Sequence, residues 1–285
     1  MVKLLDKISE TSCFGGTIGF YKHYSAATDC DMRFSVYQPP GEGPFPVLTW
    51  LSGLTCTEEN FQIKSGIHRL AAEHGFLIVN PDTSPRGCDV EGEDDSWDFG
   101  TGAGFYLDAT QKPWNKNYRM YSYVVQDLQA AIFANFSGDR DKQGIFGHSM
   151  GGHGAITIGI RNPEIYKSIS AFAPICAPSD CPWGQKAFKN YLGENQDGWA
   201  KYDSSKLIAS IEDAVNRPAI LVDQGLADDW LENELHPHLL EQAAAESGYP
   251  LQVRRQSGYD HGYYFIATFL ADHLEHHANS LVEKS

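Results

Sequence analysis

The fold is decided by the stretch Lys142-Gln-Gly-Ile-Phe-Gly-His-Ser149-Met-Gly151. Its apolar centre predicts a buried strand, and the Ala-, Ile- and Gly-rich residues 151–162 predict a helix directly after the turn. Gly147 and Gly151 flank Ser149 in the pattern Gly-x-Ser-x-Gly, which is typical of a strained strand-to-helix turn that exposes a serine hydroxyl. Glycine is needed at both positions because side chains there would collide across the turn. We therefore predict that Ser149 is a nucleophile.

Strand and helix patterns alternate on both sides of this unit. We expect strands at 32–37, 46–52, 76–80, 142–148, 167–174, 218–223 and 251–256, and helices at 58–75, 121–136, 151–162, 233–247 and 263–280. This alternation predicts a mostly parallel, doubly wound sheet flanked by helices, in a single domain spanning 1–285. The Gly-x-Ser-x-Gly turn within it indicates the α/β-hydrolase fold. The segments at about 82–114 and 176–200 do not fit the scheme, and we expect them to be long loops that form one rim of a site.

A serine nucleophile needs a base, and in this fold the partners follow the serine in the order Asp or Glu, then His. His261 lies in a turn between the last predicted strand and the last predicted helix, where the fold supplies the catalytic imidazole. By contrast, we expect His273, His276 and His277 on a solvated face of the last helix, near its C-terminus. His261 is therefore the predicted base.

The acid should follow the preceding strand, and three carboxylates are available there. Asp223 is the last residue of the predicted strand, so we expect its side chain to bond the backbone of the following loop. Asp228 lies a few residues into that loop and can reach an imidazole. We choose Asp228 as the acid, and its neighbour Asp229 remains the nearest alternative.

The oxyanion hole needs two N–H donors, one from the residue after the nucleophile and one from a loop after an early strand. Met150 supplies the first donor. The second is expected from the loop at 51–60, where Leu54 is our candidate. Cys56, in the same loop, is either a packed small hydrophobic residue or a thiol at the rim of the site.

Composition and charge exclude several classes of protein. The 22 Lys and Arg against 37 Asp and Glu give a net charge of -15, which argues against a nucleic-acid partner. No apolar stretch reaches the roughly 20 residues of a membrane span. The start of the chain lacks the apolar core of a signal peptide, and we interpret the six cysteines as reduced thiols, so we expect a cytoplasmic protein. The chain has no His-Glu-x-x-His or Cys-x-x-Cys motif, and we expect no metal.

Several longer motifs carry a resemblance along nearly the whole chain. They are Trp50-Leu-Ser-Gly-Leu-Thr-Cys-Thr-Glu-Glu-Asn-Phe, Pro81-Asp-Thr-Ser-Pro-Arg-Gly, Ser96-Trp-Asp-Phe-Gly-Thr-Gly, Phe146-Gly-His-Ser-Met-Gly-Gly-His-Gly-Ala and Tyr259-Asp-His-Gly-Tyr-Tyr-Phe. With these motifs the sequence resembles the S-formylglutathione hydrolase (esterase D) family. The resemblance implies hydrolysis of S-formylglutathione to glutathione and formate in formaldehyde removal, side activity on short acyl esters, no cofactor and a homodimer.

The same resemblance places the family's catalytic triad on Ser149, Asp228 and His261, and its oxyanion donors on Leu54 and Met150. This agrees with the choices made from chain order.

A formyl group needs only a small acyl pocket, and Trp97 and Trp183 are candidates for its walls. Arg86 and Lys186 are candidates for holding the carboxylates of glutathione. Two other functions stay open: a general carboxylesterase, and an inactive hydrolase domain that only binds its ligand.

Overall fold

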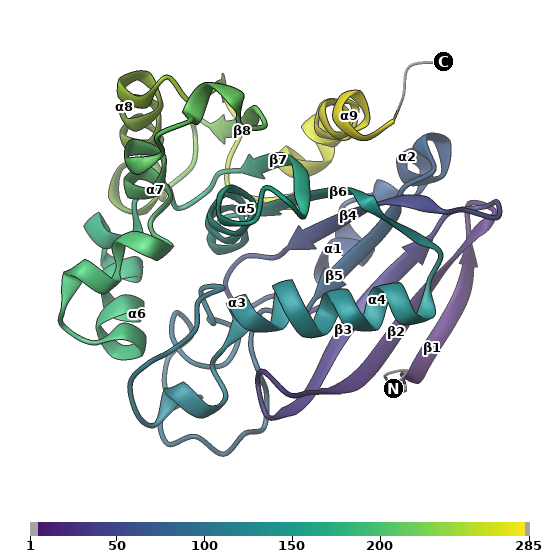
Figure 1. Cartoon of the computed structure of the whole chain (residues 1–285), viewed down its shortest axis with the longest axis horizontal. Helices are drawn as coiled ribbons and strands as arrows, with labels where there is room; N and C mark the ends of the chain where they lie inside the picture. The colour runs from purple at the N-terminus through teal and green to yellow at the C-terminus, as the bar shows by residue number, and fades with distance from the viewer. Residues whose placement is uncertain (1–4, 283–285) are drawn as a thin grey trace.

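A computed structural model describes residues 5–282. Its centre is a nine-stranded sheet (Figure 1). Across the sheet the strands are β1 (Asp6–Cys13), β2 (Gly16–Ser25), β3 (Cys30–Gln38), β5 (Leu77–Pro81), β4 (Phe45–Leu51), β6 (Gly138–His148), β7 (Tyr166–Phe172), β8 (Ile220–Gly225) and β9 (Leu251–Gln256). The six strands from β5 to β9 in this order pair in parallel, so their carboxyl ends meet at one edge of the sheet.

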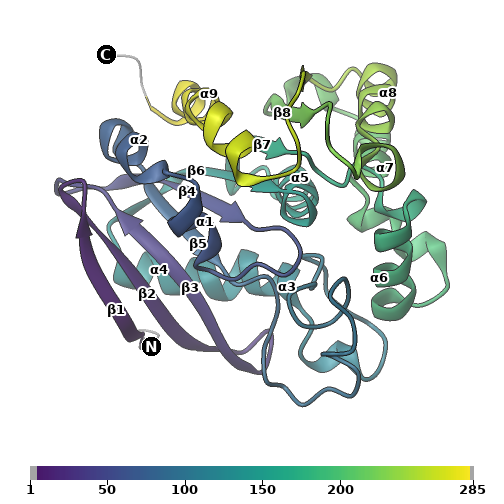
Figure 2. The same cartoon turned by 180° about the vertical axis from the view of Figure 1, so that it is seen from behind.

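Helices cover both faces of the sheet, as the α/β-hydrolase fold requires. The helices are α1 (Asn60–Lys64), α2 (Ile67–His74), α3 (Met120–Ser122), α4 (Gln129–Asn135), α5 (Met150–Arg161), α6 (Pro182–Leu192), α7 (Ser204–Ser210), α8 (Pro237–Ser247) and α9 (Tyr263–Leu281). Figure 1 shows α3, α4 and α5 in front of the sheet, and Figure 2 shows α1, α2 and α9 on the opposite face. Among residues 5–282, no helix combines the length and apolar character needed to cross a bilayer.

Short helical turns complete the chain. They are 3₁₀ turns at Trp114–Lys116, Pro178–Asp180, Gln196–Gly198, Ala200–Tyr202 and Ala214–Asn216, and π turns at Tyr123–Leu128 and Leu231–Leu235. The first π turn joins α3 to α4, so the helix predicted at 121–136 is present with a widened middle.

Each strand of the parallel part matches a predicted strand to within a few residues, but the antiparallel part was not predicted beyond residues 32–37 of β3. The edge strand β1 is exposed along almost its whole length, so no alternation of buried and exposed residues marks it in the sequence. Its turn into β2 uses Phe14 and Gly15, with φ of 46° and 76°. Positive φ at both positions is what a type I′ hairpin turn requires.

Three helical predictions differ from the structure. The helix expected at 58–75 is divided into α1 and α2 by Gly66, whose φ is 71°. The helix expected at 233–247 begins only at Pro237, because residues 231–235 form a π turn. The segment expected as a loop at 176–200 contains α6, whereas residues 82–113 contain no helix or strand.

The expectation that His273 and His277 lie on a solvated face is wrong, because α9 packs against β7 and buries both side chains. The His277 ring accepts or donates hydrogen bonds at 2.6 Å to Ser168 Oγ and 3.0 Å to Ser170 Oγ. His273 contacts Ser170 Oγ at 2.8 Å and the carboxylate of Asp223 at 3.1 Å. Serines on the covered face of β7 therefore satisfy these buried imidazoles.

Asp223 also differs from its expectation, because its side chain bonds other side chains rather than the loop. It accepts hydrogen bonds from Arg254 at 2.8 and 2.5 Å, from Gln256 at 2.9 Å, and from His273 at 3.1 Å. Burial alone would raise the pKa of Asp223, but these donors outweigh it and lower the pKa to about 2. Asp223 thus links β8, β9 and α9 at the base of the site.

Buried histidines make the stability of this fold depend on pH. Burial lowers the pKa of His148 and His277 well below the ordinary value and that of His153 to about 4. In the unfolded chain the same groups titrate near ~6.5. The unfolded state therefore binds more protons below that pH, and the free energy of unfolding should fall between about pH 7 and pH 5. Urea unfolding at several pH values measures this slope.

His277→Gln should reduce that slope by up to about 1.4 kcal/mol per pH unit, the contribution of one titrating group. His238 is exposed on α8, and His238→Gln serves as the matched control that should leave the slope unchanged. Equal slopes in the wild type and His277→Gln would contradict the prediction.

Candidate active site

The turn at Ser149 joins the carboxyl end of β6 to the first residue of α5. Ser149 has φ 58° and ψ -122°, a strained conformation held in part by its N–H donating to Phe172 O at 3.0 Å. A Cβ on Gly147 would lie 2.3 Å from Gly151 O, and one on Gly151 would lie 2.0 Å from Leu51 O. Both glycines are therefore required by close backbone contacts on either side of the serine.

His261 lines the same cavity as Ser149 and is in contact with Asp228. The Nδ1 atom of His261 lies 2.6 Å from Oδ2 of Asp228, whose side chain is fully buried. The carboxylate also accepts hydrogen bonds from Gln224 Nε2 at 3.2 Å and from the N–H of Trp230 at 2.9 Å. Asp229 is exposed instead. Of the two carboxylates that the sequence left open, the structure therefore places Asp228 against the imidazole.

A small cavity of about 150 Å³ opens over Ser149. Its lining residues are Gly53, Leu54, Cys56, Trp97, His148, Ser149, Trp183, Trp230, His261 and Tyr263. The sequence-predicted candidates Leu54, Cys56, Trp97 and Trp183 all line it, although they come from three separate parts of the chain. Met150 begins α5, and the first amides of a helix have no acceptor within it.

Four of the lining residues were not predicted, and each lies within two residues of a predicted one: Gly53, His148, Trp230 and Tyr263. Trp230 packs against Trp183 with ring centroids 4.6 Å apart, which extends the aromatic wall of the cavity. Tyr263 lies two residues after His261. His148, the residue before the nucleophile, has its ring 4.4 Å from that of His261.

His148 is a neutral neighbour of the imidazole of His261. Burial, and then the nearby charge of His261, lower the pKa of His148 well below its ordinary value. A protonated His148 would repel the positive charge that develops on a general base. In the sequence, His148 is marked only by its place between Gly147 and Ser149 in the Gly-x-Ser-x-Gly pattern.

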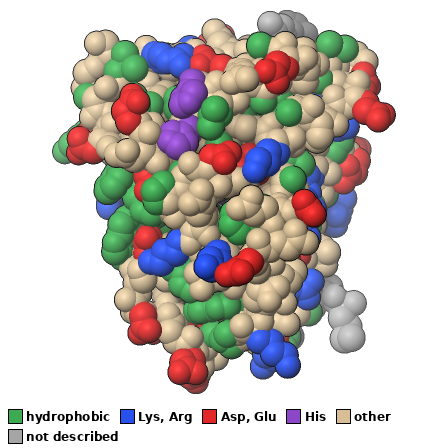
Figure 3. Space-filling view, turned by 90° about the vertical axis from the view of Figure 1, so that its left-hand side faces the viewer, with side chains coloured by type: hydrophobic (Ala, Val, Ile, Leu, Met, Phe, Trp, Pro, Cys, Tyr) green, Lys and Arg blue, Asp and Glu red, His purple; other side chains and the backbone are tan. Residues whose placement is uncertain are grey.

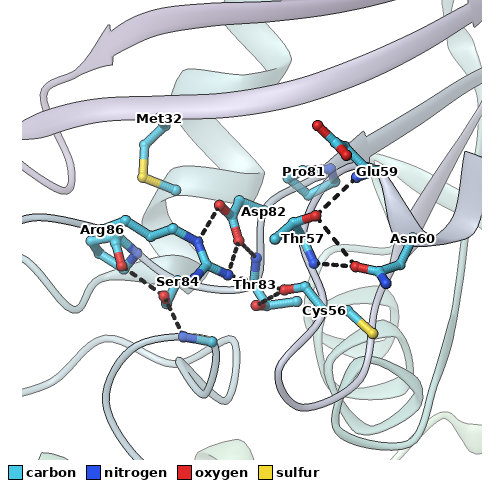
Figure 4. A network of polar contacts seen from close by, with 12 residues as sticks. Met32, Cys56, Thr57, Glu59, Asn60, Pro81, Asp82, Thr83, Ser84 and Arg86 are labelled. Carbon is cyan, nitrogen blue, oxygen red and sulfur yellow. Dashed lines mark hydrogen bonds and ion pairs between the residues drawn. The ribbon is translucent and has the colours of Figure 1, made fainter. Parts of the chain in front are cut away.

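The loop that carries Leu54 is held from below by a polar network, which Figure 4 shows from close by. The carbonyl oxygen of Cys56 accepts hydrogen bonds from Thr83 Oγ1 at 2.6 Å and from Arg86 Nη2 at 3.2 Å. Arg86 in turn donates to both carboxylate oxygens of Asp82, at 2.7 and 2.9 Å. Thr55, with φ of 67°, donates its N–H to Gly102 O at 2.9 Å.

The cations proposed from the sequence to hold glutathione are both engaged elsewhere. Arg86 is paired with the buried Asp82, and Lys186 lies 2.5 Å from Asp98 and 2.8 Å from the hydroxyl of Ser96. Each of these cations is therefore already neutralised by a carboxylate. The sequence named both as candidates for binding a carboxylate, but it did not indicate these acidic partners, because contacts between loops bring them together.

The thiol of Cys56 lies at the cavity without the features of a nucleophile. Burial raises its pKa, so the thiol stays protonated at neutral pH. Within residues 5–282, no group of three or more His, Cys, Asp and Glu side chains is placed to hold a metal ion.

Comparisons with known proteins identify the family of this chain. The model of the Esterase family matches residues 25–276. A serine hydrolase of Staphylococcus aureus described as fluorophosphonate-binding shares the fold, with a TM-score of 0.73 over 93% of this chain and 99% of its own at 17% identity. The fold, the serine turn and the family match together define an esterase with the α/β-hydrolase fold.

Closer relatives narrow the family. The S-formylglutathione hydrolases of Mus musculus and Arabidopsis thaliana are each 53% identical to this chain, over 97% and 99% of it and 99% of their own lengths. A structure of an S-formylglutathione hydrolase from Agrobacterium tumefaciens superposes with a TM-score of 0.93 at 48% identity, covering 97% of this chain and 99% of that one. The chain belongs to the S-formylglutathione hydrolase family.

The two neighbouring aspartates provide a matched pair of variants. Asp228→Asn removes the charge that orients and stabilises His261, and we expect kcat to fall about 10⁴-fold. Asp229→Asn changes an exposed carboxylate, and its kcat should stay within about twofold of the wild type. Steady-state kinetics on p-nitrophenyl acetate measures both, and a larger loss in Asp229→Asn would contradict the assignment.

Proposed function

We propose that this chain hydrolyses S-formylglutathione to glutathione and formate through a formyl-serine intermediate on Ser149. The observation that carries the proposal is the contact of 2.6 Å between His261 and the buried Asp228 beside the strained Ser149 turn. The relatives named above, at 53% identity, support the choice of substrate.

In the first step His261 removes the proton of the Ser149 hydroxyl as the oxygen attacks the thioester carbonyl. Asp228, bonded to Nδ1 of His261, holds the ring with Nε2 free to act and stabilises the imidazolium. The developing oxyanion is stabilised by the N–H groups of Leu54 and Met150. The polar network beneath Cys56 keeps the first of these donors in place before substrate binds.

In the second step the carbon–sulfur bond breaks and the glutathione sulfur leaves with the proton held by His261. Water then attacks the formyl-serine, with His261 again taking a proton. His261 returns this proton to the Ser149 oxygen as the bond between that oxygen and the formyl carbon breaks. Formic acid is released and loses its proton to the solvent as formate, which leaves the free Ser149 hydroxyl and a neutral His261.

The size of the cavity favours a formyl group over longer acyl groups. Only about 150 Å³ is open over Ser149, and Trp97, Trp183 and Trp230 form one wall of it. A formyl group adds only hydrogen beyond the carbonyl, whereas each added methylene must displace packed aromatic rings. We therefore propose that turnover of esters declines as the acyl chain lengthens.

The proposal is tested by comparing kcat/KM for S-formylglutathione with that for p-nitrophenyl acetate. We expect the thioester to be favoured at least tenfold, because only it supplies binding energy from the tripeptide. A preference for the simple ester would favour the alternative function, a general carboxylesterase.

Ser149→Ala should reduce kcat on the order of 10⁶-fold, as the loss of a triad nucleophile does in other serine enzymes. Ser280→Ala, at an exposed position near the far end of α9, is the matched control with wild-type activity. A fluorophosphonate probe should label the wild type and the control but not Ser149→Ala. An unlabelled wild type would instead indicate an inactive binding domain.

We also propose a homodimer in the cytoplasm. The family resemblance supports the dimer, and the six free thiols fit a reducing compartment. Analytical ultracentrifugation should give a mass twice that of the 31.6 kDa chain, and a monomer at micromolar concentration would contradict the dimer.

A further inference from the structure

The cavity over Ser149 is too small for the whole of the proposed substrate. Its volume of about 150 Å³ lies below the roughly 300–1,000 Å³ of sites that enclose small-molecule ligands. The formyl group and the sulfur fit there, but the tripeptide that carries the sulfur must lie outside. A second depression next to the cavity is therefore a candidate site for the tripeptide.

A groove of about 610 Å³ begins at Tyr263, whose side chain lines both the groove and the cavity. Its lining residues are Lys64, Ser65, Gly66, Tyr263, Tyr264 and Ala267, from the end of α1 and the first turns of α9. Both helices lie on the face of the sheet shown in Figure 2. Tyr264 is 90% exposed, so an aromatic surface on this groove is open to a ligand.

The direction of the leaving group points to the same groove. The sulfur must depart beside His261, because that imidazole supplies its proton. Tyr263 follows His261 by two residues, and its ring lies 6.4 Å from the ring of His148, which itself contacts His261. Tyr263 therefore lies on the side of the cavity where the sulfur departs, and it is also the residue that the cavity shares with the groove.

Lys64 is the cation of this groove. Its side chain is exposed, and its ammonium lies 5.5 Å from the centroid of the Tyr263 ring. Among the ion pairs of residues 5–282, none includes Lys64, whereas Arg86 and Lys186 are paired with Asp82 and Asp98.

The net charge of -15 disfavours the binding of an anion over most of the surface. An anionic ligand therefore depends on individual cations near its site. The face seen in Figure 3, toward α6 to α8, shows Lys and Arg side chains scattered among acidic ones, without a broad basic patch. Glutathione has a glycyl carboxylate without a neighbouring cation, while its γ-glutamyl carboxylate lies next to its own ammonium. A lone lysine therefore matches the glycyl end.

We propose that the glutathione moiety lies in the groove between α1 and α9, with its glycyl carboxylate paired with Lys64. Lys64 is thus a specificity-determining residue that distinguishes the thioester of glutathione from simple esters. The inference rests on the proposed function, because it assigns the binding site of that substrate's leaving group.

Lys64→Gln tests the pairing by removing the charge while keeping the length of the side chain. We expect the KM for S-formylglutathione to rise about two- to fivefold, the range for loss of one ion pair at a solvated site, with a smaller change in kcat. The ratio of kcat/KM for S-formylglutathione to that for p-nitrophenyl acetate should fall by a similar factor. Lys142→Gln, at the fifth residue of β6 and outside the lining of the groove, is the matched control.

A second substrate separates charge pairing from a structural role. S-formylglutathione with its glycyl carboxylate converted to the ethyl ester should show a raised KM with the wild type and no further increase with Lys64→Gln. Increasing salt should raise the KM of the wild type for the free acid more than that of the variant.

The outcomes distinguish this inference from the proposed function. If the wild type hydrolyses S-formylglutathione efficiently and Lys64→Gln has an unchanged KM, the inference is overturned and the proposed function stands. Equal increases of KM for the free acid and the ethyl ester in Lys64→Gln also overturn it, since the lysine would then act without the carboxylate. A wild type that does not hydrolyse S-formylglutathione overturns the proposed function itself.

Discussion

The rest of the site depends on the close packing of backbone around Ser149. The serine can hold φ of 58° only because Gly147 and Gly151 let the ends of the turn approach each other and the neighbouring strand β4. That contact aligns the carboxyl end of β6 with the amino end of α5. Ser149 consequently lines the small cavity at the point where α5 begins, and acyl transfer needs N–H donors close to such a nucleophile.

Two carboxylates near the end of β8, Asp223 and Asp228, have different roles because they have different hydrogen-bond partners. Asp223 is surrounded by donors from β9 and α9, and the lowering of its pKa to about 2 keeps it charged as a structural link. Asp228, five residues later, is buried against His261 and receives only one side-chain donor besides the imidazole. Asp223 holds α9 through its contact with His273. Because α9 begins two residues after His261, this contact also supports the turn that carries the partner of Asp228.

The loops around the cavity are held in place by residues that do not line it. Arg86 and Thr83 hold the carbonyl of Cys56 from beneath, so the loop that carries Leu54 is supported by residues that never reach the cavity. Lys186 is likewise bound to Asp98. The charges nearest the site therefore shape its walls, which leaves the exposed Lys64 beyond Tyr263 to interact with an anionic ligand.

The sequence by itself determined the parallel core, and it was enough to predict Ser149 as the nucleophile and His261 as the base. These depend on short-range patterns: apolar runs, two glycines at fixed spacing, and chain order. It did not determine β1, whose exposed residues carry no periodicity, or the burial of His273 and His277, which depends on packing between distant segments. Which of Asp228 and Asp229 contacts His261 also depends on the tertiary structure. Adjacent side chains point in different directions, and the fold places Asp228 against the imidazole and leaves Asp229 exposed.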